Sequence, residues 1–297
     1  MFNKFLLLQQ TVETLKKGDF EVFVTSGCFD VAARREYLLL LKVLFNMDSF
    51  SEEHALSLRS TSYFLSGYPF IVSVRSTRYF LDDNTVYSKF SLPVVTPKLL
   101  EKIVTERPPV IEASKGKLTA EIDAELLRKK RMELGYTIEE LAKKVGISKK
   151  ALYEIEHKRV EPSVKNVEKL EKIIDADLRI SFNFKEPEPA YLKPKDDLEK
   201  KVSQGLKKMG VDNSCVRSLL FNLVGREKFS LITSLFKGQE KMDENIRMVK
   251  KLASIVCSKV LFIAKRPAES LEDVPLLLES DLFEMSKKEF QKLIKAS

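Results

Sequence analysis

The segment from Ser148 to Arg159 concentrates side chains that can hydrogen-bond to nucleic acid. A lysine ammonium can donate to O6 and N7 of guanine, and a glutamate carboxylate can accept from N4 of cytosine. From Lys143 to Arg159, six basic residues stand against two acidic ones, which favours a polyanionic partner. Charge runs in isolation are more often solvated helix faces. The choice between these readings depends on the elements that carry the segment.

Those elements can be read between Asp123 and Asp175. A first helix ends at Gly135, which suits the left-handed position after a helix. The sequence Thr137-Ile138-Glu139-Glu140 is a capping box and starts a second helix. Gly146 permits a tight turn, and Ser148 caps a third helix. The spacing therefore predicts a helix-turn-helix whose third helix exposes one face.

This stretch resembles the lambda-repressor and Cro-like helix-turn-helix family, whose third helix reads bases in the major groove. The resemblance covers about 53 of the 297 residues and rests on these positions: Arg131, Gly135, Thr137, Glu140, Leu141, Ala142, Gly146, Ile147, Ser148, Leu152, Ile155, Glu156 and Pro162-Ser163. It implies that double-stranded DNA is contacted by Thr137, Ser148, Lys149, Lys150, Tyr153, Glu154, Lys158 and Arg159. Arg131 and Glu156 form a structural pair in this family. Ile138 replaces a common glutamine, so one phosphate contact is expected to be lost.

The first 106 residues predict an α/β domain that lacks part of a nuclease active site. Helices at 5–17, 51–65 and 97–104 alternate with strands at 21–25, 37–45, 69–74 and 93–95, with a turn at Ser26-Gly27. Asp30 and the strand containing Lys42 resemble the restriction-endonuclease-like fold, which includes archaeal junction resolvases. That fold places a second acid two residues before the lysine, where this chain has Leu40. One carboxylate holds a magnesium ion poorly, so we expect no catalytic residue and no metal here. The structural alternative is that Asp30 is a turn residue and that Lys42 is a strand residue whose ammonium group reaches solvent.

The whole layout is a multidomain α/β (α+β) protein. We expect a nuclease-like domain at 1–106 and, at 107–184, a β-hairpin around Lys115-Gly116, the helix-turn-helix at 123–175 and a strand at 178–184, the strands forming a small sheet. A Pro-rich linker at 185–195 precedes an α/β domain at 196–297. That last domain should hold helices at 197–209, 243–257 and 287–294 and strands at 215–224, 229–236, 260–264 and 275–278. Its element order raises the possibility that it repeats the first domain, although α/β proteins share such orders by chance.

Composition narrows the class of protein. The net charge is +8, from 51 basic and 43 acidic residues, which favours a polyanionic partner only weakly. Three distant cysteines and two histidines predict neither a disulfide framework nor a metal site, and no cofactor is expected. No apolar run approaches the roughly 20 residues of a membrane span, and no signal peptide is evident. We therefore expect a cytoplasmic protein without a membrane partner.

The layout of a repressor-like motif between two α/β segments is similar to archaeal helix-turn-helix transcriptional regulators. The resemblance implies a DNA-binding transcriptional regulator that is not an enzyme. We expect a homodimer that places two recognition helices in successive major grooves, because one head buries too little surface for tight specific binding. The alternatives are a metal-dependent, structure-specific nuclease or DNA-repair factor targeted by the helix-turn-helix, and a scaffold whose flanking domains bind another protein.

Overall fold

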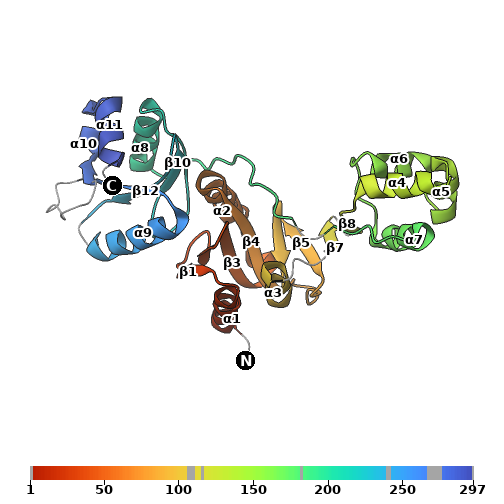
Figure 1. Ribbon diagram of the computed structural model, residues 1–297. Helices are drawn as coiled ribbons and strands as arrows, with labels where there is room; N and C mark the ends of the chain where they lie inside the picture. Colours follow the sequence, from red (N-terminus) through yellow and green to blue (C-terminus); the bar gives the residue numbers. More distant parts are fainter. Residues whose placement is uncertain are drawn as a thin grey trace. The chain divides into compact units, whose positions relative to one another are not determined.

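A computed structural model describes residues 3–105, 111–114, 117–180, 183–238, 242–265 and 276–295. The chain forms two compact units. The flanking unit combines Met1–Tyr79 with Phe184–Ser297, and the inserted unit is Phe80–Asn183. Figure 1 labels the elements of both. Among the described residues, no helix is both long and apolar enough to cross a membrane.

The N-terminal half of the flanking unit is a helix, three antiparallel strands, a second helix and a parallel strand. Its elements are α1 (Lys4–Lys17), β1 (Glu21–Val24), β2 (Val31–Arg34), β3 (Leu38–Asn46), the short 3-10 helix η1 (Met47–Ser49), α2 (Glu52–Leu65) and β4 (Gly67–Arg75). The strands β1, β2 and β3 pair antiparallel in that order, and β4 runs parallel to β3. The run Leu38–Leu41 is fully buried, as expected of a central strand covered on both faces.

The predicted helices and strands of this half are confirmed, with one correction. The prediction joined strands 21–25 and 37–45 by a turn at Ser26-Gly27, whereas β2 lies between them. Such a strand is hard to recognise from the sequence, because it is four residues long and contains Ala32 and Ala33, a residue type depleted in strands. Asn3 and Ser51 cap α1 and α2, and α2 ends at Ser66 in the left-handed conformation.

The C-terminal half of the flanking unit has the same order of elements. It contains α8 (Asp197–Lys208), β9 (Asp212–Cys215), β10 (Leu223–Arg226), β11 (Ser230–Phe236), α9 (Met242–Val256), β12 (Lys259–Ala264), β13 (Leu276–Leu278), α10 (Glu279–Glu284) and α11 (Lys287–Lys295). The strands β9, β10 and β11 pair antiparallel, and β12 runs parallel to β11. The predicted strand at 215–224 is wrong, because its two ends belong to β9 and β10 and a loop separates them.

The inserted unit joins a small sheet to five helices. Its elements are β5 (Thr85–Lys89), β6 (Leu92–Val95), α3 (Pro97–Thr105), β7 (Ile111–Ser114), β8 (Lys117–Ala120), α4 (Ala124–Glu133), α5 (Ile138–Val145), α6 (Lys149–Glu156) and α7 (Val164–Ile174). β5 pairs with β6 and β7, and β7 pairs with β8. The hairpin strands are confirmed, whereas Lys115-Gly116 lies outside the described residues. The predicted strand at 178–184 is wrong over its described part, where only Arg179 makes a ladder contact, with Ile122.

Candidate nucleic-acid interface

Helices α4 to α7 enclose a small apolar core that fixes the position of α6. The core is built from residues that are at most 4% exposed: Leu127, Leu141, Ala142, Val145, Leu152, Ile155, Val167, Leu170 and Ile174. Ala142 and Leu152 lie on the neighbouring helices α5 and α6, which pack against each other. The predicted inner faces of the second and third helices are thereby confirmed. One side of α6 is committed to this core, so the remaining side faces outward.

Three local features define α5 and the turn into α6. Thr137 Oγ1 accepts from the Glu140 amide at 3.2 Å, and Glu140 Oε2 accepts from the Thr137 amide at 2.8 Å, so the capping box is formed. These bonds hold the pKa of Glu140 below its usual value, the Thr137 amide first among them. Gly146 has φ of 82°, the left-handed conformation that glycine adopts without strain. Ser148 Oγ accepts from the Ala151 amide at 3.0 Å and starts α6.

A buried ion pair ties the first helix of the motif to the end of α6. Arg131 Nε and Nη2 donate to the two carboxylate oxygens of Glu156 at 2.6 and 2.9 Å, and Nη1 donates to the Tyr136 carbonyl at 2.9 Å. The two side chains are 9% and 1% exposed. Hydrogen bonding to Glu156 raises the pKa of Arg131. Both charged groups pair with each other inside the motif, as a structural role requires.

The outward side of α6 presents the residues expected to read bases. Lys149, Lys150 and Tyr153 are exposed, and Glu154 is half-buried. Lys149 Nζ lies 3.3 Å from Glu139 Oε2 on α5, and both side chains are more than 60% exposed. An ion pair this exposed contributes little stability and can be exchanged for a phosphate or a base. The structure thus brings Lys149, Lys150, Tyr153 and Glu154 together on one helix face.

Of the remaining predicted contact residues, Ser148, Lys158 and Arg159 lie around the ends of α6, and Thr137 caps the start of α5. Arg159 Nη1 is 3.5 Å from Glu154 Oε1, and Lys158 Nζ is 3.0 Å from Glu125 Oε1, which raises the pKa of Lys158. The hydroxyls of Thr137 and Ser148 are engaged in helix caps. The Thr137 amide also donates to Glu140 within the capping box, so the exposed surface of Thr137 and Ser148 is what remains for contact with DNA.

Two acidic residues outside α6 pair with lysines of the basic face. Glu139 Oε2 accepts from Lys149, and Glu125 Oε1 accepts from Lys158. Lys149 is ten residues after Glu139, and Lys158 is 33 residues after Glu125. Pairs at such separations cannot be recognised from helical periodicity. These acids would hold the lysines in place until an anionic partner replaces them.

In the flanking unit, Asp30 and Lys42 meet as the nuclease-like pattern suggested. Lys42 Nζ lies 3.2 Å from Asp30 Oδ1 and also donates to the Gly27 carbonyl. Lys4 Nζ reaches the same Oδ1 at 3.2 Å, and the Val43 amide donates to Oδ2 at 2.9 Å. Asp30 and Lys42 are buried, so Lys42 does not reach solvent as the structural alternative had it.

This site does not fit the metal that a nuclease of this fold would hold. Oδ1 of Asp30 faces two ammonium groups, Oδ2 accepts a backbone amide, and Leu40 contributes no oxygen. A hard divalent cation needs several oxygen ligands. Within the described ranges, no group of three or more His, Cys, Asp or Glu side chains could hold a metal ion. Lysine charge thus neutralises the one carboxylate.

The C-terminal half has an uncharged counterpart of this site. Asn222 precedes β10 as Asp30 precedes β2, and Ser234 faces it on β11 as Lys42 faces Asp30 on β3. The Leu235 amide donates to Asn222 Oδ1 at 2.9 Å, and Ser234 Oγ donates to the Leu220 carbonyl at 2.7 Å. Both halves therefore fasten the loop before their second strand to their third strand. Neither charge is needed for that connection.

Two regions of the chain match known families. Residues 5–110 match a PD-(D/E)XK superfamily domain, and residues 127–180 match a helix-turn-helix family. The restriction-endonuclease-like resemblance of the N-terminal domain and the helix-turn-helix are thus confirmed. No solved structure matches the chain.

Archaeal relatives are similar over most of the chain. One protein of Pyrococcus abyssi, with the name "Putative HTH-type transcriptional regulatory protein", is 32% identical over 84% of this chain and 83% of its own length. A protein of Thermococcus kodakarensis with the same description is 31% identical, over 94% and 91% of the two chains. Another, of Methanocaldococcus jannaschii, is 25% identical over 96% and 94%. The similarity thus extends across both flanking regions and the motif between them.

Proposed function

Because the chain belongs to the archaeal family of HTH-type transcriptional regulatory proteins, we propose that it binds specific DNA sequences through α6 and regulates transcription. The observation that carries this proposal is the outward face of α6, where Lys149 and Lys150 stand exposed on a helix fixed by a buried core and the Arg131–Glu156 pair. Ser148 and Glu154 complete the base-reading set, with Tyr153 nearby. Thr137, Lys158 and Arg159 are assigned to the phosphates on either side.

The proposal is tested by selecting bound DNA from a random pool, with and without divalent metal. A recovered consensus site should then bind the Lys149→Ala/Lys150→Ala variant at least tenfold more weakly at fixed salt, since each lost base contact costs about 1–3 kcal/mol. Lys172→Ala is the matched control, because Lys172 is an exposed lysine on α7. Unchanged affinity of the double variant would remove α6 from the reading role.

We further propose that two chains act together on a pseudo-palindromic site. One helix-turn-helix presents too little surface for tight specific binding, and two heads about one helical turn apart would supply the rest. Light scattering on the chain bound to its selected site should give two chains per DNA. One chain per site, with the same affinity and specificity, would exclude the homodimer.

The nuclease-like domain is proposed to support the fold rather than to cleave DNA. Asp30 is occupied by Lys4, Lys42 and the Val43 amide, which leaves the cleavage alternative without a metal site. Incubation of duplex and branched DNA with magnesium or manganese should yield no product. Metal-dependent cleavage that is lost in Asp30→Ala would reverse this assignment.

We propose also that residues 196–297 repeat the first domain. The two halves share the α-β-β-β-α-β order, the antiparallel and parallel pairings, and the Asp30 and Asn222 hydrogen bonds.

The remaining proposal is that the flanking unit binds another protein. Partner binding that survives Lys149→Ala/Lys150→Ala would support it.

A further inference from the structure

The strands of the two halves of the flanking unit can be matched residue by residue through their strand pairs. Val24 pairs with Val31 in the first half, and Cys215 pairs with Leu223 in the second. Three residues after Val24 and Cys215 come Gly27 and Ser218, which are therefore counterparts. The loop at 216–222 is one residue longer than the loop at 25–30, so the positions nearest the second strand are counted back from Val31 and Leu223. This count makes Phe29, just before Asp30, the counterpart of Phe221, just before Asn222.

Counterpart residues touch each other where the halves meet. Gly27 and Ser218 form an isolated antiparallel bridge, and the rings of Phe29 and Phe221 are 6.3 Å apart, both fully buried. A Cβ atom on Gly27 would come 2.9 Å from the Cα atom of Ser218, so the approach is close. A residue can contact its own counterpart only where it lies near a two-fold axis.

Away from this axis, the contacts occur as reciprocal pairs. Arg34, the last residue of β2, donates to the carbonyls of Ile255 and Val256 at 2.8 and 3.1 Å. Arg226, the last residue of β10, donates from Nε to the Phe64 carbonyl at 3.2 Å and from Nη2 to the Tyr63 carbonyl. Each arginine thus neutralises the C-terminal end of the other half's second helix, where carbonyls carry partial negative charge.

The second helix of each half also packs against strands of the other half. α2 packs on its own strand β4 and also on β10 and β11 of the other half, while α9 packs on its own β12 and on β1 and β2. In Figure 1, α2 lies between β4 and β10. Each second helix is therefore enclosed by two sheets, one from each half.

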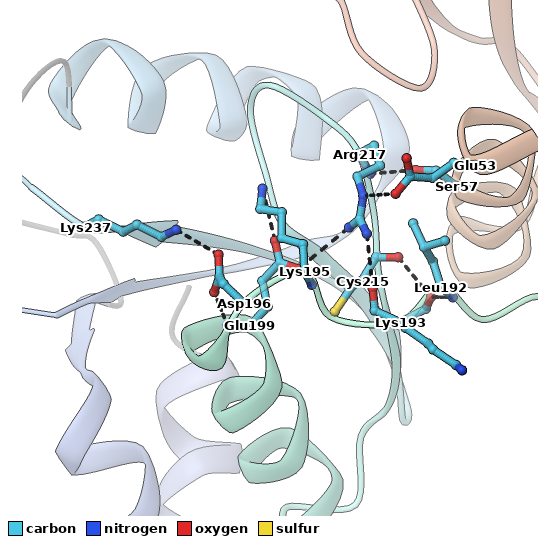
Figure 2. Close-up of polar contacts among 11 residues, drawn as sticks. Glu53, Ser57, Leu192, Lys193, Lys195, Asp196, Glu199, Cys215, Arg217 and Lys237 are labelled. Carbon is cyan, nitrogen blue, oxygen red and sulfur yellow. Dashed lines mark hydrogen bonds and ion pairs between the residues drawn. The ribbon is translucent and has the colours of Figure 1, made fainter. Parts of the chain in front are cut away.

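One polar network at this boundary has no reciprocal copy. Figure 2 shows Arg217 between the two halves: its Nε donates to Glu53 of α2 at 2.7 Å, its amide donates to Ser57, and its Nη2 donates to the Lys193 carbonyl. The counterpart of Arg217 is Ser26, two residues after Val24, which cannot make such contacts. Arg217 thus adds a contact specific to the second half.

We infer that the two halves pair about an approximate two-fold axis as a dimer of one fold contained in a single chain. This inference rests on the proposed repeat. The surface around Gly27, Phe29 and Arg34 takes a second copy of the same fold as its partner, and residues 197–264 supply that copy. Because the chain itself occupies this surface, the homodimer proposed above must form through another one.

The test is to cut the chain and ask whether the halves stay together. A specific protease site inserted between the exposed Glu186 and Pro187 allows cleavage of the folded full-length protein. Sedimentation of the cut protein should show fragments 1–186 and 187–297 moving as one species at micromolar concentration. Arg34→Ala and Arg226→Ala should each weaken this association about 10- to 100-fold, since each removes hydrogen bonds made by a charged group.

Arg35→Ala is the matched control, because Arg35 donates to Glu36 and Gly18 of its own half. If either alanine variant fails to fold, Arg34→Lys and Arg226→Lys keep the charge and lose the two-pronged contact, and should weaken association by similar, smaller factors. Separate sedimentation of the wild-type fragments, or an effect of only one of the two arginines, would overturn the inference. DNA binding by uncut protein is measured in parallel, so failure here stays distinct from failure of the proposed function.

Discussion

Replacing Asp30 and Lys42 together should harm the protein less than replacing Asp30 alone. Asp30→Asn leaves the buried Lys42 ammonium without its carboxylate, and breaking a buried pair in this way costs about 3–5 kcal/mol. Asp30→Asn/Lys42→Met removes both charges, keeps a side-chain oxygen for the Val43 amide and fills the volume of the lysine stem. Replacing a buried pair by uncharged groups of similar size is close to neutral, so we expect a loss below about 2 kcal/mol.

The C-terminal half supplies the reason for this expectation, because Asn222 and Ser234 make the same connection without charge. The measurement is native-state hydrogen exchange of the β2 and β3 amides, which reports the opening free energy of this region in a chain of two units. Lys4→Met is the control, since the Lys4 side chain is half exposed and its loss should cost less than about 1 kcal/mol. Equal destabilisation by the single and double variants would refute the view that this pair is a replaceable structural connection.

Three further outcomes follow from the buried and titrating groups. Arg131→Met should lower the opening free energy of α4 to α6 by about 3–5 kcal/mol, and Arg131→Met/Glu156→Met should recover much of that loss. Hydrogen exchange can measure both values, and a loss below about 1 kcal/mol in the single variant would contradict the structural role. Only Cys257 should react with a thiol reagent at pH 8, because burial raises the pKa of Cys28 and raises that of Cys215 to about 12. Mass spectrometry of the labelled native and unfolded protein checks this prediction, and rapid labelling of Cys215 in the native protein would be inconsistent with it. Lys237 lowers the pKa of Asp196, so the ion pair stabilises the fold above the unfolded-state pKa of Asp196, and this contribution is lost as pH falls through the lowered pKa. Lys237→Met should therefore cost less than about 1 kcal/mol at pH 7 and progressively less as the pH falls below the unfolded-state pKa, as denaturant unfolding over that range can measure; a cost that does not fall with pH would contradict it.

The helix-turn-helix was predictable because its signals are local. The Thr137–Glu140 capping box, the Gly146 turn and the Ser148 cap each involve residues no more than four positions apart. The pairing of Arg131 with Glu156 required the family resemblance, since 25 residues separate them.

The flanking unit shows where sequence reasoning reached its limit. Its helices and long strands follow from periodicity, whereas β2 and the split between β9 and β10 depend on pairing with strands elsewhere in the chain. Likewise nothing local indicates the partners of Arg34, which are carbonyls more than 220 residues away. Tertiary partners decide which charged residues remain exposed.

The discontinuity of the flanking unit has a consequence for synthesis of the protein. On the ribosome, residues 80–183 emerge complete and can fold while Met1–Tyr79 still lacks the residues that cover it. Until the segment after Phe184 emerges, buried side chains such as Phe29 are without their native contacts, because Phe221 has not been made. The helix-turn-helix should therefore fold first, and a chain arrested midway would join a folded helix-turn-helix to an incompletely folded, aggregation-prone flanking unit.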